Sequence, residues 1–188
     1  NGLILYHGMG SGKTCSAIRI TEEFRKYNKY NINFKKIMII ASPNVQENFK
    51  LQLFDENKLT KVNNLWKLDG CMGLEFIEEL NNYDVENMSK EEIVKKIKKI
   101  INSSYSFIGY EKLSNIIEKE LNKIKTSDKE KRKNIVKKQL NKLFSDTLIV
   151  VDEAHNIRLS SINSKKKTAT MLEILVSNVK KMKLLLLT

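Results

Sequence analysis

The chain has 188 residues, enough for one globular domain with a hydrophobic core and too few for two large ones. Hydrophobic residues make up 41% and charged residues 30%, which excludes collagen-like and wholly disordered chains. Lys and Arg number 34 against 22 acidic residues, so the formal net charge is +12. This balance favours polyanionic partners such as nucleic acid, anionic lipid or nucleotide, although a Lys-, Asn- and Ile-rich composition, as AT-rich coding gives, explains part of it equally well.

The two cysteines and the hydropathy pattern indicate the cellular environment in which the chain is expected to occur. Cys15 and Cys71 are far apart and form no CxxC pair, so the sequence supports neither a disulfide framework nor a zinc site. We therefore expect an intracellular, reducing environment. No apolar run approaches the roughly 20 residues of a membrane span, so no membrane partner is expected. The chain begins with Asn1 rather than Met and stops on an apolar run, which indicates a piece of a longer protein.

Short apolar runs alternate with helical patterns along the chain. Most of these runs are continuously apolar, which is typical of a parallel sheet covered by helices on both faces. The stretches between them have the 3–4 residue spacing of amphipathic helices. This alternation predicts an α/β doubly wound sheet. The six predicted strands are Gly2–Tyr6, Lys36–Ala41, Asn64–Leu68, Tyr105–Gly109, Thr147–Val151 and Lys183–Thr188.

A glycine-rich loop follows the first predicted strand and opens a helix. Its sequence is His7-Gly8-Met9-Gly10-Ser11-Gly12-Lys13-Thr14. Glycines let the backbone wrap closely around phosphates, and the helix N-terminus adds partial positive charge. Lys13 can reach the β- and γ-phosphates, and the Thr14 hydroxyl can ligate Mg²⁺. The strict pattern of such loops has Gly where this chain has His7, but the remaining pattern predicts a nucleotide-binding loop.

The segment Glu111–Ser145 is Lys-rich and lacks Gly and Pro. Its pattern predicts two amphipathic helices with a charged joint at Thr126–Lys133. Two interpretations stand side by side: a basic arm over nucleic acid, or a solvated helical insertion with one core-facing stripe. Charge runs on helices are usually solvated faces, so the second interpretation is favoured.

A second motif with chemically active side chains follows the predicted strand Thr147–Val151. Asp152 and Glu153 follow this strand directly, at the edge where ligands bind in open α/β sheets. Asp152 is placed to hold Mg²⁺, and Glu153 to orient and polarise an attacking water. His155 lies two residues further on, and we expect it to sit between the nucleotide and neighbouring elements rather than to take part in the chemistry. An acidic pair after a strand is weak evidence by itself, but together with the upstream loop it predicts a Mg-ATP site.

These motifs resemble those of superfamily 2 DEAD/DEAH-type helicases and translocases, in the first RecA-like lobe. Gly8–Thr14 is similar to motif I, with a Met-Gly-x-Gly-Lys-Thr form similar to Swi/Snf-type proteins, and Asp152-Glu153-Ala154-His155 to motif II in its DEAH form. Ile39–Asn44 resembles motif Ia and Phe107–Glu111 the surroundings of motif Ib. Leu184–Thr188 resembles the strand that enters motif III. The composition and the run Ser42–Phe49 also look similar to helicases of large nucleocytoplasmic DNA viruses.

The resemblance implies a RecA-like P-loop NTPase lobe over residues 1–188, with 111–145 as a Lys-rich helical insertion. It implies ATP and Mg²⁺ as cofactors, nucleic acid as partner with DNA favoured over RNA, and a second RecA-like lobe elsewhere in the same protein. A viral factory or virion becomes a candidate location. The implied catalytic residues are Lys13, Asp152 and Glu153, with coupling through His155 and Thr188. The implied nucleic-acid contacts are Ser42, Pro43, Asn44 and Tyr110.

Three functions remain open at this point. The first is an ATP-driven nucleic-acid motor that separates strands. The second is a duplex DNA translocase or transcription-associated ATPase that moves without separating them. The third is an assembly or binding module in which ATP acts as a switch. Dependence of the ATPase rate on nucleic acid discriminates the motors from the switch.

Overall fold

The main sheet consists of five parallel strands in the order β1-β7-β6-β2-β5. The computed structural model describes residues 2–6, 12–31, 33–80, 85–156 and 163–188. Five of the six predicted strands form this sheet, each within one residue of its predicted ends, so the prediction of a parallel α/β sheet is confirmed. Their bounds are β1 Gly2–Leu5, β2 Ile37–Ile40, β5 Tyr105–Ile108, β6 Leu148–Val151 and β7 Lys183–Leu187.

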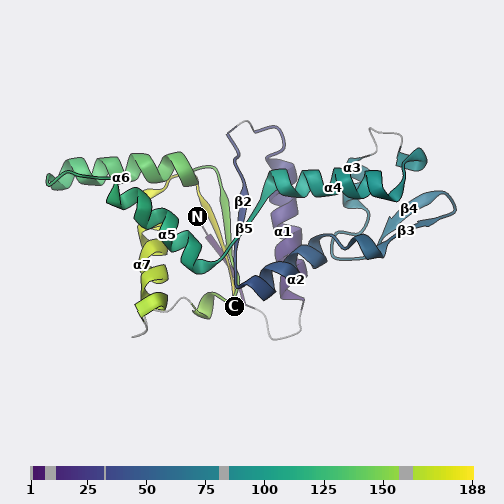
Figure 1. Ribbon diagram of the computed structural model, residues 1–188, viewed down its shortest axis with the longest axis horizontal. Helices are drawn as coiled ribbons and strands as arrows, with labels where there is room; N and C mark the ends of the chain where they lie inside the picture. Colours follow the sequence, from purple (N-terminus) through teal and green to yellow (C-terminus); the bar gives the residue numbers. More distant parts are fainter. Residues whose placement is uncertain (1, 7–11, 32, 81–84, 157–162) are drawn as a thin grey trace.

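Helices cover both faces of this sheet (Figure 1). One side carries α1 Lys13–Tyr27, α2 Pro43–Leu53, α3 Glu75–Glu79 and α4 Lys90–Ser104. The other side carries α5 Tyr110–Asn122, α6 Lys129–Phe144 and α7 Asn163–Asn178. Short 3₁₀ turns lie at Glu56–Lys58, Val85–Asn87 and Ala154–Asn156. The architecture is that of an α/β RecA-like lobe. None of the described helices is both long and apolar enough to cross a membrane.

Two hydrophobic cores lie on opposite faces of the sheet because successive strand residues point in opposite directions. In β2, Ile37 and Ile39 pack with the α1, α2 and α4 layer, whereas Ile40 packs with the α5, α6 and α7 layer. In β6, Val150 and Val151 divide in the same way. Burial on both faces explains why these strands are continuously apolar.

The predicted strand Asn64–Leu68 is not part of the parallel sheet. β4, Leu65–Leu68, pairs antiparallel with β3, Leu59–Val62, in a separate two-stranded hairpin. Asn63 and Asn64 join the two strands with φ of 49° and 64°. Asparagine tolerates this left-handed conformation, which two-residue hairpin turns require. The Asn-Asn pair was therefore the sequence signal for a hairpin.

The Lys-rich segment forms two helices, as predicted, but its second helix starts earlier than expected. α6 begins at Lys129, because the Asp128 carboxylate accepts hydrogen bonds from the backbone N–H groups of Glu130 and Lys131 at 2.9 and 3.0 Å. Each helix contributes buried side chains to the sheet's second core: Leu113 and Ile117 from α5, Leu140 and Phe144 from α6. The predicted core-facing stripe is thus confirmed.

The expectation of two separate cysteines was wrong. Cys15, in the first turn of α1, forms a disulfide with Cys71, with a Cα–Cα distance of 5.2 Å. The two residues are 56 positions apart, and only the fold brings them together. Spacing in sequence cannot predict such a pair, because it depends on how α1 packs beside the segment that leads into α3.

Ion pairs join α1 to α3 along most of its length. Arg19 and Lys26 both pair with Glu75, and the Arg25 Nη2 atom lies 2.6 Å from the Glu79 Oε2 atom. Arg25 is buried and also pairs with Glu22, at 2.7 Å. The helix that follows the glycine-rich loop is therefore fixed at its first turn by the disulfide and further along by these pairs.

Candidate active site at the carboxyl edge of the sheet

The carboxyl ends of all five parallel strands meet at one edge, near the C label in Figure 1. Backbone hydrogen bonds continue across this edge beyond the strands themselves. The Thr188 N–H donates to the Leu5 carbonyl at 3.1 Å, and the Asp152 N–H donates to the Ile40 carbonyl at 3.1 Å. The ends of β1, β2, β6 and β7 are therefore held in register where the predicted site residues emerge.

The glycine-rich loop leaves β1 at this edge. His7, Gly8, Met9, Gly10 and Ser11 lie outside the described residues. Gly12 precedes α1 with φ of 81°, and an added Cβ would meet no atom within 4 Å. The backbone conformation, not lack of space, is therefore what favours glycine at this position.

Lys13 and Thr14 open α1, and the Lys13 side chain points to the end of β6. The Lys13 Nζ atom lies 2.9 Å from Glu153 Oε1 and 3.8 Å from Asp152 Oδ1. The two predicted motifs are thus in direct contact, although Lys13 and Glu153 are 140 positions apart in the sequence. A half-buried ammonium between two carboxylates is a strong electrostatic centre, because partial burial reduces screening by water.

Asp152 is buried, with 3% of its surface exposed. Burial raises the pKa of its carboxyl group, and it is opposed by the hydrogen bond from the Glu153 N–H, at 2.8 Å, and by the charge of Lys13. The charge of Lys13 therefore favours the ionised form of this carboxylate against the effect of burial. An anionic carboxylate is the form that can ligate Mg²⁺.

Glu153 lies between two basic side chains. Its Oε1 atom contacts Lys13, and its Oε2 atom is 3.1 Å from His155 Nδ1. Its backbone has φ of 51°, a left-handed conformation that is uncommon for residues other than glycine and clusters at functional sites. The sharp turn after β6 thus directs the Glu153 carboxylate toward the start of α1.

Tyr110 supports this turn, a role that the sequence did not indicate. Its hydroxyl group donates a hydrogen bond to the backbone carbonyl of Asp152. Burial, followed by the charges of Asp152 and Glu153, raises the pKa of the Tyr110 phenol to about 12. The phenol therefore remains a hydrogen-bond donor through the neutral pH range. We predicted Tyr110 as a nucleic-acid contact, and the structure places its hydroxyl group on the acidic turn.

The other predicted contacts lie on neighbouring strand ends. Ser42 precedes α2, whose first residues are Pro43 and Asn44, and all three are exposed beyond β2. Thr188 follows β7 beside the end of β1. These residues share the carboxyl edge with the Lys13–Glu153 pair, so one ligand surface can include both groups.

The chemistry of the oxygen donors fits Mg²⁺. Within the described residues, no group of three or more His, Cys, Asp or Glu side chains is arranged to hold a metal ion. Mg²⁺ does not need such a cage, because it is usually bound through one or two carboxylates together with phosphates and water. Asp152 and the Thr14 hydroxyl are the groups of this edge that fit that pattern.

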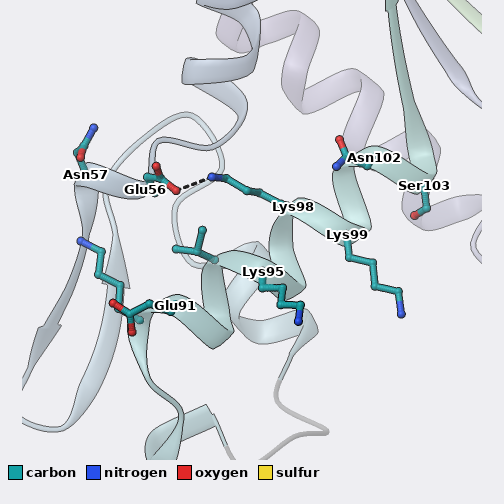
Figure 2. A pocket seen from close by; sticks show the side chains of 10 residues that line it. Glu56, Asn57, Glu91, Lys95, Lys98, Lys99, Asn102 and Ser103 are labelled. Atoms are coloured by element: carbon teal, nitrogen blue, oxygen red, sulfur yellow. Dashed lines mark hydrogen bonds and ion pairs between the residues drawn. The ribbon is translucent and has the colours of Figure 1, made fainter.

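A large hollow lies elsewhere, on α4 (Figure 2). It has a volume of about 1000 Å³. Lys95 and Lys99 line it, and the Lys98 Nζ atom bridges to Glu56 Oε2 at 2.6 Å. This hollow is open to solvent and contains none of the predicted site residues, so size alone does not locate the active site.

Three viral proteins are similar to this chain. A protein of Invertebrate iridescent virus 3 that is assigned as a helicase is 30% identical over 195 residues, covering 100% of this chain and 16% of the relative. Two proteins of Acanthamoeba polyphaga mimivirus, assigned as ATP-dependent RNA helicases, are 27% and 26% identical over 163 and 169 residues. Each alignment covers 83% of this chain, and 21% and 13% of the respective relative.

No protein-family model and no solved structure matches the chain. The chain spans less than a quarter of the length of each viral relative. An α/β lobe with a lysine and two carboxylates at its carboxyl edge defines a candidate nucleotide-binding protein. The relatives add a more particular likeness: the chain is similar to parts of viral proteins that are assigned as helicases, which agrees with the predicted likeness to viral proteins.

Proposed function

We propose that this chain is the Mg-ATP-binding lobe of a superfamily 2, DEAH-type, nucleic-acid-dependent ATPase. The observation that carries the proposal is the contact of Lys13 with both Asp152 and Glu153. A phosphate-binding lysine, a Mg²⁺-binding carboxylate and a water-activating carboxylate are three of the protein groups that ATP hydrolysis at such a site uses. The spacing of residues 8–14 around Lys13 supports the same proposal.

Lys13 changes partner in the proposed cycle. Its ammonium group contacts Glu153 at 2.9 Å in this structure. Binding of ATP brings the β- and γ-phosphates to the start of α1, where the lysine and the helix N-terminus favour negative charge. The lysine then exchanges a carboxylate for phosphate oxygens, and Glu153 becomes free to accept a proton from water. His155, at 3.1 Å, is placed to keep the Glu153 side chain oriented.

The polymer is proposed to cross the exposed end of β2. Ser42, Pro43 and Asn44 are exposed at the end of β2, and the Ser42 side chain makes no capping hydrogen bond to α2, so these side chains are accessible to a polymer. The predicted preference was for DNA, whereas the mimivirus relatives are assigned as RNA helicases, so both polymers belong in the test. A second lobe in the same protein would close the site from its open side.

The test is steady-state ATPase of the full-length protein without polymer and with single-stranded DNA, duplex DNA or RNA. We expect strong stimulation by one polymer, and strand displacement or triplex displacement then separates an unwinding motor from a duplex translocase. The Glu153→Gln variant should retain ATP binding and lose turnover by about 10²-fold or more, because general-base catalysis contributes factors of this size.

A matched control is Glu120→Gln, a carboxylate on α5 that pairs with Lys123 away from the site and should leave turnover unchanged. Normal hydrolysis by the Glu153→Gln variant would show that another group activates the water. ATPase that is indifferent to every polymer would favour the ATP-switched assembly module.

A further inference from the structure

A second candidate site lies at the amino edge of the sheet, opposite the nucleotide site. Here the chain passes from α1 to β2, enters β6 from α6 and enters β7 from α7. These three passages enclose a hollow of about 460 Å³. Neither the sequence motifs nor the proposed ATP site uses this region.

Aromatic rings form one wall of this hollow. Phe24 and Phe34 pack edge to face with ring centroids 5.6 Å apart, and both are half-buried. Tyr27 stands at the rim with 87% of its surface exposed. Exposed aromatic faces in a concave polar site offer stacking surfaces for nucleobases, since every base has a π face.

Amide and carboxylate groups form a second wall. The Asn28 side chain donates to the Phe24 carbonyl at 2.8 Å and accepts from Asn31 Nδ2 at 3.1 Å, so it is fixed in one orientation. Asn33 and Asp146 also line the hollow. Such groups can pair with the donors and acceptors on the edge of an unpaired base.

Lysines complete the site at the entrance to β7. Lys181 and Lys183 both line the hollow, and neither forms an ion pair with any of the described residues. Lys181 and Asp146 have φ of 59° and 56°, a left-handed conformation that costs energy outside glycine. The backbone therefore turns sharply at both positions beside the hollow.

We propose that this hollow binds one unpaired base of a nucleic-acid strand, with Tyr27 stacking on the base and Lys181 and Lys183 contacting the adjacent phosphates. The inference rests on the proposed nucleic-acid-dependent function. It adds a contact on the face of the lobe that the ATP site does not use, so a strand engaged there lies apart from Ser42, Pro43 and Asn44. The preference is for single strands, because a paired base cannot enter the hollow.

The test measures binding of the full-length protein to a fluorescent single-stranded oligonucleotide, as DNA and as RNA, over a range of salt concentrations. The Tyr27→Ala variant should bind about 5- to 100-fold more weakly, and Tyr27→Phe should restore binding because it keeps the ring. The Lys181→Ala variant should lower the salt dependence by about one unit of the log–log slope. Bromouracil in the strand should photo-crosslink to Tyr27.

Adjacent residues provide matched controls. Tyr30, with 89% of its surface exposed, and the exposed Lys180 lie outside the lining of the hollow, so their alanine variants should bind as the wild type does. If the Tyr27 and Lys181 variants bind the oligonucleotide as tightly as these control variants do, the inference is wrong. Competition by a nucleoside monophosphate as strong as that by the strand would likewise overturn it, since the ligand would then be a free nucleotide.

Failure of this inference is distinguishable from failure of the proposed function. The Tyr27 and Lys181 variants leave the Lys13, Asp152 and Glu153 groups intact, so ATPase without polymer should stay at the wild-type rate. Wild-type strand binding in these variants together with polymer-stimulated ATPase would remove only the second site. If no polymer stimulates the ATPase of the wild-type protein, the proposed function itself is wrong.

Discussion

Individual residues at the carboxyl edge have roles that depend on their neighbours. The sequence identified Lys13, Asp152 and Glu153 from their motifs, and the structure brings both carboxylates within 4 Å of the Lys13 ammonium group. The sequence did not identify Tyr110 as a hydrogen-bond donor to the Asp152 carbonyl, because no local pattern links a residue after β5 to the backbone after β6. Motifs predict chemistry, whereas such cross-strand support depends on the sheet order.

The hydroxyl group of Tyr110 is expected to contribute to both stability and turnover. The Tyr110→Phe variant removes the donor to the Asp152 carbonyl, so we expect a loss of about 1 kcal/mol in the free energy of unfolding. Turnover should fall several-fold while ATP affinity changes little, because the turn that orients Glu153 loosens. Chemical denaturation and single-turnover ATPase measure the two effects. Unchanged turnover would show that the turn is rigid without this bond.

The pKa of Tyr110 also sets a pH window. Its folded-state value of about 12 is above the ordinary 10.0, so the native state favours the neutral phenol. The stability from this shift is complete below pH 10 and is lost as pH rises toward 12, where the unfolded chain ionises first. The wild type should therefore lose part of its excess stability over Tyr110→Phe within this window and not at lower pH.

Helices and strands were predicted more reliably than their connections. Five strands followed from continuous apolar runs, because both sheet faces are covered and no alternation is needed. β4 was assigned to the wrong sheet, since a short apolar run does not reveal its partner and the turn at Asn63 and Asn64 was not recognised. The disulfide between Cys15 and Cys71 was missed for a related reason: its two ends meet only after α1 has packed.

The disulfide between Cys15 and Cys71 is expected to stabilise the fold against heat. It closes a loop of 56 positions, which corresponds to a stabilisation of about 2–4 kcal/mol through the unfolded state. Dithiothreitol should therefore lower the melting temperature of the 188-residue chain. The double variant Cys15→Ser and Cys71→Ser should melt lower and show no further response to the reductant. A wild type that is equally insensitive would mean that the bond does not form in solution.

The contact between α1 and α3 is expected to make the stability of the fold depend on pH in the acid range. Burial raises the pKa of Glu79, but the hydrogen bond and charge of Arg25, followed by those of Lys29, outweigh it and hold the pKa below 4.5. A lowered carboxyl pKa contributes stability at pH values above 4.5, and this contribution is lost as the pH falls through the folded-state value. Acid unfolding should therefore begin at higher pH in the Glu79→Gln variant, which we expect to lose about 1–2 kcal/mol at pH 7.

The adjacent Glu78 provides the control, because it is exposed and forms no ion pair with the described residues. The Glu78→Gln variant should follow the wild-type acid-unfolding curve. Coincident curves for Glu79→Gln and the wild type would show that Glu22 alone satisfies Arg25.

The chain matches only a small part of each viral relative's length. It spans 16% of the iridovirus relative, and its edge strand β1 leaves Leu3 and Ile4 50% and 63% exposed. Among the described residues, the charged groups of the proposed ATP site come from the start of α1 and the turn after β6. We therefore expect the 188-residue chain alone to bind ATP weakly and to hydrolyse it far more slowly than the full-length protein. Comparison of the two turnover rates at saturating polymer measures this, and equal rates would show that no second lobe contributes.

The attachment of α1 has a mechanical consequence. α1 begins at the proposed phosphate site, and the Cys15–Cys71 bond and the Arg19, Arg25 and Lys26 pairs join it to the segment around α3. A force applied at the start of α1 therefore moves the helix and its neighbour together rather than tilting the helix within the lobe. We therefore expect a displacement at the start of α1 to be passed on to α3 rather than absorbed within α1.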